Sequence, residues 1–133
     1  MLKRRSFIIG SVVIVSFSLM AMAFVSAQGA GKGDAAKGKE IFDTKCASCH
    51  GPSGKGDGPA AATLPTKPRD LSDASYVSTL TDDHIFKTVK EGGASVGKSP
   101  LMPPWGSVLS EEDIWNVIAY VRSEICKCEY KEK

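Results

Sequence analysis

The chain has 133 residues, of which 17 are Lys or Arg and 15 are Asp or Glu, so its formal net charge is +2. This length favours one small domain. Three of the basic residues, Lys3, Arg4 and Arg5, lie in the first 27 residues, where no acidic residue occurs, and no basic block occurs later in the chain. The balance of charge therefore argues against a nucleic-acid partner.

The first 27 residues have the pattern of a secretory signal peptide. Met1–Arg5 is positively charged, Phe7–Val25 is apolar, and Val25-Ser26-Ala27 provides the small residues of a cleavage site. The alternative is an uncleaved membrane anchor, because the apolar stretch is just long enough to span a bilayer. Either interpretation predicts an exported, periplasmic protein, and only the second predicts a membrane contact.

The segment 28–33 is rich in glycine and predicts a flexible linker. Asp34 is a suitable cap for a helix over Ala35–Thr44. Two loops are expected next, because glycine and proline recur through Gly51–Leu64 and a further proline interrupts Lys67–Asp73.

The second half of the chain predicts two further helices. Thr81 caps Asp82–Glu91, and Ser110 begins a capping box before an apolar helical stripe over Glu111–Ile125. Between these helices, Gly97–Gly106 is a proline-rich loop. The expected architecture is one all-α domain over 34–126 with a polar tail over 127–133. Long ordered loops in so small a domain require something to hold them, and a large cofactor would do so.

Cys46-Ala47-Ser48-Cys49-His50 has the C-x-x-C-H pattern of c-type haem attachment. One helical turn separates the two thiols, so both can bond to one porphyrin while the histidine binds its iron. Three alternatives are a zinc site completed by Cys126 and Cys128, a thioredoxin-like redox pair, and a simple disulfide. A zinc site leaves the proline-rich loop unexplained, and the redox pair needs a βαβ context that the sequence lacks.

Met102 is the candidate for the sixth ligand of the iron. The other methionines, Met1, Met20 and Met22, all lie in the export segment. Met102 lies within Ser99–Trp105, where prolines stiffen the chain and can hold a weak thioether bond in place. The alternative ligand is His84, in the first turn of a predicted helix.

These motifs together resemble the class I cytochrome c family in its bacterial periplasmic single-haem form. The matching segments are Cys46–His50, Gly51–Pro59, Lys67–Asp73, Met102–Trp105 and the last helix. The resemblance implies a small all-α cytochrome c fold, with short helices and long loops around one covalently bound haem. It also implies that the first and last helices cross, with Gly38 and Phe42 facing the last helix.

The same resemblance implies further contacts of the haem. A backbone carbonyl near a loop proline should accept a hydrogen bond from the haem histidine, with Pro68 the first candidate and Pro59 the second. Arg69 and Trp105 are candidates for hydrogen bonds to a haem propionate. The cofactor expected is one haem c with its iron.

The implied function is one-electron transport in an extracytoplasmic respiratory chain, without catalysis, between transient redox protein partners. Two rivals are a haem enzyme with an open sixth position and a subunit fixed in a larger membrane redox complex. The pair Cys126 and Cys128 is not part of the family pattern, and no histidine follows it. These two cysteines are expected to bond either to each other or to a partner chain.

Overall fold

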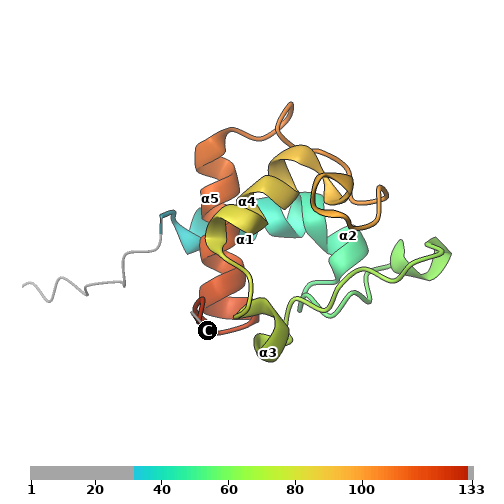
Figure 1. The fold of residues 1–133 in the computed structure, drawn as a ribbon, viewed down its shortest axis with the longest axis horizontal. Helices are drawn as coiled ribbons and strands as arrows, with labels where there is room; N and C mark the ends of the chain where they lie inside the picture. The colour runs from blue at the N-terminus through green and yellow to red at the C-terminus, as the bar shows by residue number, and fades with distance from the viewer. Residues whose placement is uncertain (1–31, 132–133) are drawn as a thin grey trace, which may run out of the picture.

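The computed structural model describes residues 32–131, and this part of the chain consists of helices and loops without any strand. The signal segment 1–27, most of the linker and the last two residues lie outside the described residues. The helices are α1 (Ala35–Ile41), η1 (Phe42–Cys46), α2 (Ala47–His50), η2 (Ala61–Thr63), α3 (Ala74–Val77), α4 (Asp82–Glu91), η3 (Gly93–Val96), α5 (Glu111–Tyr120) and η4 (Val121–Ile125). Figure 1 shows that they surround the middle of the molecule, with long loops between α2 and α3.

Capping residues fix the starts of the longer helices. The hydroxyl of Thr81 accepts from the amide of His84 at 3.0 Å, and Ser110 forms a complete capping box with Asp113. The predicted helix Asp82–Glu91 is therefore confirmed at both ends. The predicted helix Glu111–Ile125 is also confirmed, and its last turn, η4, is π-helical.

Two helical segments differ from the prediction. The first helix starts after Asp34 as expected but continues beyond Thr44 through η1 and α2 to His50. It ends at Gly51, whose φ of 76° belongs to the left-handed region that glycine tolerates. The short helix α3 was not predicted; its start is stabilised by the Asp73 carboxylate, which accepts from the amides of Ser75 and Tyr76.

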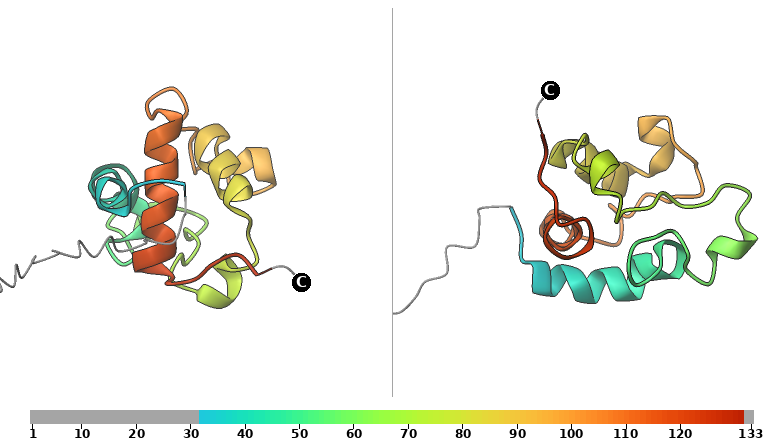
Figure 2. Two further views of the ribbon diagram at one scale, coloured as in Figure 1. Left: turned by 90° about the vertical axis from the view of Figure 1, so that its left-hand side faces the viewer. Right: turned by 90° about the horizontal axis from the view of Figure 1, so that it is seen from below.

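The first and last helices cross, as the family resemblance implies. Gly38 lies directly on the backbone of Asn116, since a Cβ added to this glycine would come within 2.5 Å of the Asn116 carbonyl carbon. One turn later the rings of Phe42 and Tyr120 pack with their centroids 5.4 Å apart. Figure 2 shows the steep crossing, with α5 end-on in the right-hand view while α1 runs across it.

A second apolar cluster joins α4 to the other side of α5. Val89, Leu109, Ile114 and Ile118 are its buried residues. Phe86 of α4 stacks on Trp115 of α5 at a centroid distance of 4.6 Å. Helix α5 is therefore the central element between α1 and α4, as the left-hand view of Figure 2 shows. No helix among residues 32–131 has both the length and the apolar character needed to cross a membrane.

The chain after η4 turns back toward α3. Cys126 and Cys128 are joined by a disulfide, so the first of the two pairings considered from the sequence is the one observed. The amide of Lys131 donates to the Ser78 carbonyl at 2.8 Å. The polar side chains of this segment are exposed as expected, but its backbone is tied to the end of α3.

Candidate functional site

A cavity of about 570 Å³ lies between α2, α3, α4 and the loop that precedes α5. This volume is within the range of roughly 300–1,000 Å³ that is usual for sites of small molecules and cofactors. Its lining includes all seven site residues predicted from the sequence, which are Cys46, Cys49, His50, Pro68, Arg69, Met102 and Trp105. His84 also lines it, whereas Pro59 does not.

The last residue of η1, Cys46, and the end of α2 present the two thiols and the imidazole to this cavity. Cys46 and Cys49 are free cysteines, half-buried like His50 beside them. Burial raises the pKa of the Cys46 thiol to about 11, and the neighbouring Cys49 adds to the shift. Cys46 is therefore a protonated thiol near neutral pH.

The loop after α2 folds back on this segment and fixes its backbone. The amide of Gly56 donates to the His50 carbonyl at 2.8 Å, and the amide of Gly58 donates to the Cys49 carbonyl at 3.2 Å. Gly56 also lies against the carbonyl of Pro68, where a Cβ would come within 3.1 Å of the carbonyl carbon. Two loops are thus packed together behind the histidine.

The imidazole of His50 is oriented by a backbone carbonyl of the second loop. Its Nδ1 lies 3.3 Å from the carbonyl oxygen of Arg69, which leaves Nε2 as the ring nitrogen available to a ligand. Burial lowers the pKa of His50, and the contact with the Arg69 carbonyl opposes that shift. A neutral imidazole is the form that binds a metal.

This contact corrects the prediction that the Pro68 carbonyl faces the histidine. The Pro68 carbonyl is directed at Gly56, and the next carbonyl along the chain, that of Arg69, reaches the ring. The position of the second loop is set by the amide of Leu71, which donates to the Gly54 carbonyl at 2.7 Å. The prediction thus located the correct loop, but the carbonyl that faces His50 belongs to the residue after the proline.

The side chain of Arg69 lies on the ring of Tyr76, with its guanidinium carbon 4.0 Å from the ring centroid. A cation over an aromatic face is held by the quadrupole of the ring. Tyr76 belongs to α3, so this contact joins the loop that faces His50 to the next helix. Sequence reasoning did not identify Tyr76; the signal that would have placed it is the cap at Asp73, which starts α3.

Met102 reaches the same cavity from the proline-rich loop. This loop is tied to the end of α4 and to η3: the amide of Gly93 donates to the Met102 carbonyl at 2.9 Å, and that of Trp105 donates to the Val89 carbonyl at 2.9 Å. The Met102 side chain is half-buried and packs against the cluster around Val89. The structure thus brings the predicted sixth ligand to the cavity lined by His50.

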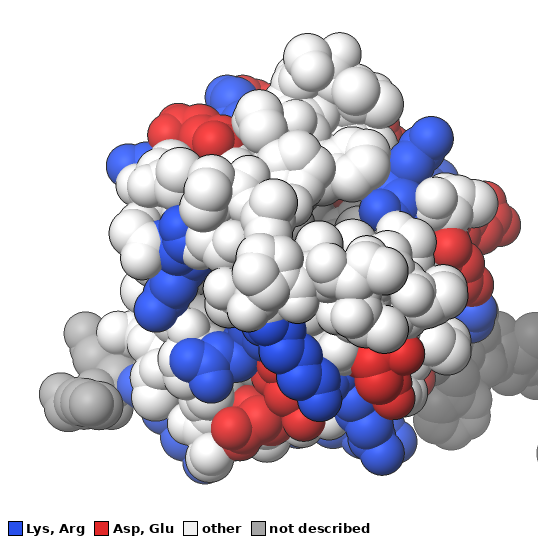
Figure 3. All heavy atoms as spheres, turned by 90° about the vertical axis from the view of Figure 1, so that its right-hand side faces the viewer, with Lys and Arg blue, Asp and Glu red and all other residues white. Residues whose placement is uncertain are grey.

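Positive charge predominates among the ionisable side chains at the cavity. Five exposed cationic residues line it, against the single carboxylate of Asp70; they are Lys45, Lys55, Lys67, Arg69 and Lys98. Figure 3 shows the face on the side of α2 in Figure 1, where a largely uncharged area is bordered by Lys and Arg side chains and, in places, by Asp and Glu. This charge suits a ligand that carries acidic groups.

Comparison with known proteins decides the family. The family model described as cytochrome c oxidase, cbb3-type, subunit III matches residues 33–121. Cytochrome c-554(547) of Halothiobacillus neapolitanus is 36% identical over 91 residues, which cover 67% of this chain and 94% of that protein. The chain belongs to the cytochrome c family.

Other relatives of this cytochrome c differ in size. The cytochrome c6 structure from the diatom Phaeodactylum tricornutum has a TM-score of 0.52 and 28% identity, covering 70% of this chain and 95% of that one. The FixP subunit of the cbb3-type cytochrome c oxidase of Bradyrhizobium diazoefficiens is 32% identical, over 68% of this chain but only 27% of the subunit. The cytochrome domain is therefore found both as a small protein and as part of a longer one.

Membership of the cytochrome c family implies covalently bound haem c with its iron and an electron-carrier role. The residues present fit this group. The cavity has two free thiols one helical turn apart, an imidazole whose Nδ1 is already engaged, and a thioether from another loop. Its other walls include apolar side chains of Leu71, Val77, Leu80, Ile85, Val89, Ile118 and Val121.

Proposed function

We propose that this cytochrome c would hold a single haem through thioether bonds to Cys46 and Cys49, and that His50 and Met102 would bind its iron. The observation that carries the proposal is that one cavity receives the whole C-x-x-C-H motif and a methionine from a separate loop. The contact of His50 Nδ1 with the Arg69 carbonyl supports it, because histidine ligands of metals usually donate their other ring nitrogen in this way.

When bound, haem supplies an iron that exchanges one electron between its ferric and ferrous states. Hydrogen bonds from Gly56 and Gly93 fix the backbones of His50 and Met102, so these two side chains would keep their positions when the iron changes its charge. The soft thioether of Met102 favours the ferrous state, and the Arg69 carbonyl makes His50 a stronger donor. The chain therefore sets the reduction potential and limits the reorganisation that opposes transfer.

Arg69 and Trp105 are proposed to bind the propionates, as the family resemblance implies. Both line the cavity, and the cationic side chains around it compensate acidic groups there. Arg69 already contacts Tyr76, so its guanidinium is held beside the cavity. Pro68, which packs on Gly56, is proposed to shape the loop that presents the Arg69 carbonyl to His50.

The setting proposed for the protein is an extracytoplasmic respiratory chain. The signal peptide over 1–27, the linker over 28–33 and the domain over 34–126 support export to the periplasm. There the protein exchanges electrons with transient protein partners and does not catalyse a reaction itself. Such electron-transfer encounters use small interfaces.

A second candidate function is that of a subunit fixed in a membrane oxidase. The match to the cbb3-type subunit III model and to FixP favours it. Washing of native membranes without detergent, followed by detergent extraction, separates the two functions: a soluble carrier is recovered in the aqueous wash, and a subunit comigrates with the oxidase on size exclusion of the detergent extract. The FixP match covers only 27% of that subunit, whereas the match to cytochrome c-554(547) covers 94% of that protein.

Replacement of Met102 tests the ligand proposal and the rival of an open haem enzyme together. Met102→Ala is expected to remove the weak far-red band of the ferric protein and to give high-spin iron that binds carbon monoxide. Met102→His is expected to keep the iron low-spin and to lower the potential, because imidazole is a better donor to ferric iron.

His84→Ala is the matched control, since His84 lines the same cavity but is not the proposed ligand. Its spectrum and potential should equal those of the wild type. An unchanged far-red band in Met102→Ala, or carbon monoxide binding by the wild-type protein as purified, would show that the sixth ligand has been assigned wrongly.

A further inference from the structure

The disulfide between Cys126 and Cys128 is poorly suited to a structural role. Only one residue separates the two cysteines. A disulfide stabilises a fold by restricting the unfolded chain, and this effect grows with the length of the loop that the bond closes. Here the loop contains a single residue between the two cysteines, so the effect is small. The bond is therefore expected to add little to the stability of the fold.

The backbone between the two cysteines is strained. Lys127 has a φ of 50°, the only positive value at a residue other than glycine among residues 32–131. A lysine in the left-handed region is unfavourable because its Cβ crowds the backbone. The ring closed by the disulfide holds Lys127 in this conformation, and opening the ring removes that constraint.

The two sulfur atoms lie in different environments. Cys126 is only 5% exposed and belongs to the core cluster with Phe42 and Val117. Cys128 is partly exposed, and its Sγ lies 3.7 Å from Nη1 of Arg122. Cys128 is therefore the more exposed of the two cysteines and lies beside a positive charge, so it is the one that we expect an incoming thiol to reach.

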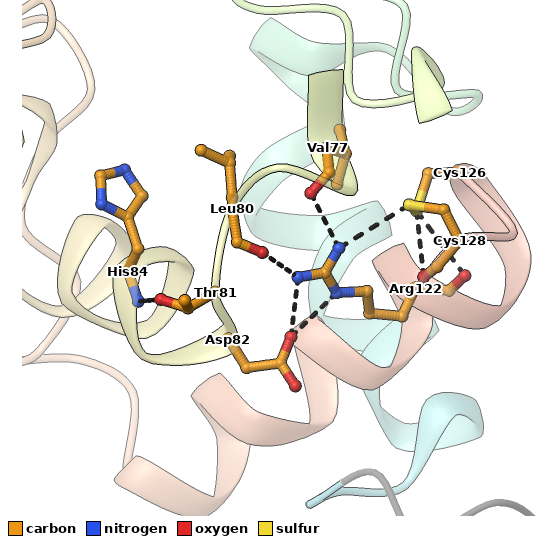
Figure 4. A network of polar contacts seen from close by, with 8 residues as sticks. All are labelled: Val77, Leu80, Thr81, Asp82, His84, Arg122, Cys126 and Cys128. Carbon is orange, nitrogen blue, oxygen red and sulfur yellow. Dashed lines mark hydrogen bonds and ion pairs between the residues drawn. A yellow bond between two sulfur atoms is a disulfide. The ribbon is translucent and has the colours of Figure 1, made fainter. Parts of the chain in front are cut away.

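Arg122 is held beside Cys128 by contacts that do not depend on the disulfide. Its guanidinium donates to the carbonyls of Val77 at 2.9 Å and Leu80 at 2.6 Å and pairs with Asp82 at 2.8 Å. Figure 4 shows these acceptors on one side of the guanidinium and the two cysteines on the other. Its side chain is 11% exposed. The positive charge of Arg122 thus remains next to Cys128 when the disulfide opens. The carboxylate of Asp82 balances part of that charge.

We propose that Cys126 and Cys128 form a thiol–disulfide exchange site, separate from the haem cavity, that reacts with a protein or small-molecule thiol. Cys128 is the sulfur that is attacked, and Cys126 is the buried leaving and resolving thiol. A thiolate next to a guanidinium in a partly exposed position has the environment of reactive cysteines in general.

The exchange is balanced by two thiols of the reductant. The first, as a thiolate, attacks Cys128 Sγ; a mixed disulfide forms, the Cys126–Cys128 bond breaks, and Cys126 leaves as a thiolate that takes up a proton. The second thiol attacks the sulfur of the first thiol in the mixed disulfide, which forms the disulfide of the reductant and releases Cys128 as a thiolate beside Arg122. Once Cys128 has also taken up a proton, Cys126 and Cys128 have together gained two electrons and two protons. The two reductant thiols are oxidised to one disulfide.

The first test is equilibration of the folded holoprotein, with its haem kept ferrous by ascorbate, in glutathione redox buffers. Thiols are trapped with iodoacetamide and counted by intact mass. The exchange site is expected to become a dithiol in a glutathione pool of cellular composition, whereas structural disulfides resist reduction by this pool. A disulfide that stays closed until the protein is unfolded would overturn the proposal.

A matched pair of variants tests which sulfur reacts. Cys126→Ser leaves Cys128 and Cys128→Ser leaves Cys126, and both lack the disulfide, so they share any loss of stability from it. With oxidised glutathione as the probe, Cys126→Ser is expected to form the mixed disulfide at least about ten times faster, because its thiol is accessible and lies beside Arg122. Equal rates, or a faster reaction of Cys128→Ser, would contradict the assigned roles.

Discussion

Gly38→Ala tests whether the close crossing of α1 and α5 supports the fold around the cavity. A Cβ at residue 38 would lie 2.5 Å from the carbonyl carbon of Asn116, still closer to its oxygen, and 3.0 Å from the Cβ of Tyr120. The first neighbour is the backbone of a central helix, which cannot move aside as a side chain can. The two helices must therefore separate along the crossing.

The magnitude follows from two opposing effects. Overpacking of a core costs about 1–3 kcal/mol, and a clash with backbone belongs at the upper end. Alanine in a helix is more favourable than glycine by about 1 kcal/mol. The net expectation is a loss of about 2 kcal/mol in the free energy of unfolding, which for a domain of roughly 100 residues lowers the Tm by about 8–16 °C.

Urea and thermal unfolding of the holoprotein, followed by far-UV circular dichroism and by haem absorbance, measure this loss. The matched control is Ala36→Gly at an exposed position of the same helix, which reports the helix propensity alone and should cost at most about 1 kcal/mol. If Gly38→Ala instead stabilised the protein by the amount that Ala36→Gly destabilises it, the crossing would not be as tight as described and the reasoning would be refuted.

Three further predictions concern the loop behind the histidine and the start of α5. Tyr76→Leu should loosen the Arg69 carbonyl that faces His50 and raise the potential by about 20–40 mV, the equivalent of about 0.5–1 kcal/mol for one electron; Tyr76→Phe keeps the ring and should leave the potential unchanged in a redox titration. Ser110→Ala should lower the free energy of unfolding by about 1 kcal/mol through loss of the helix cap, and a urea titration that shows no change would contradict this. Hydrogen bonds from the Ser110 side chain and then its amide hold the pKa of Asp113 below its ordinary value of 3.8. Because the folded-state pKa is depressed, the destabilisation by Asp113→Asn should be greatest above pH 3.8 and should diminish as the pH falls below it, whereas a pH-independent difference would show that the carboxylate charge does not matter.

The elements that the sequence predicted correctly are those whose signals are local. Thr81 and Ser110 cap helices whose bounds agree with the structure. The C-x-x-C-H motif and Met102 were identified as site residues for chemical reasons, and they line one cavity. The number of residues between the motif and Met102 does not give the distance between them in the fold. The crossing of α1 and α5 at Gly38 was expected only from the resemblance to a family.

The features that were missed depend on contacts between distant segments. Which carbonyl faces His50 is decided by the pairing of Leu71 with Gly54 and by the packing of Pro68 on Gly56, and neither leaves a pattern in the sequence. The stacking of Arg69 on Tyr76 needed the short helix α3, which is too brief to show a helical period.

The most direct test of the central claim is a pyridine haemochrome spectrum combined with the intact mass of the purified protein. We expect one haem per chain, an absorption maximum typical of haem joined through two thioethers, and a mass equal to the polypeptide plus one haem that withstands acidified acetone. In Cys46→Ser combined with Cys49→Ser, the added mass should be absent. A wild-type chain without that added mass, or one whose haem is extracted by acidified acetone, would contradict covalent attachment at Cys46 and Cys49.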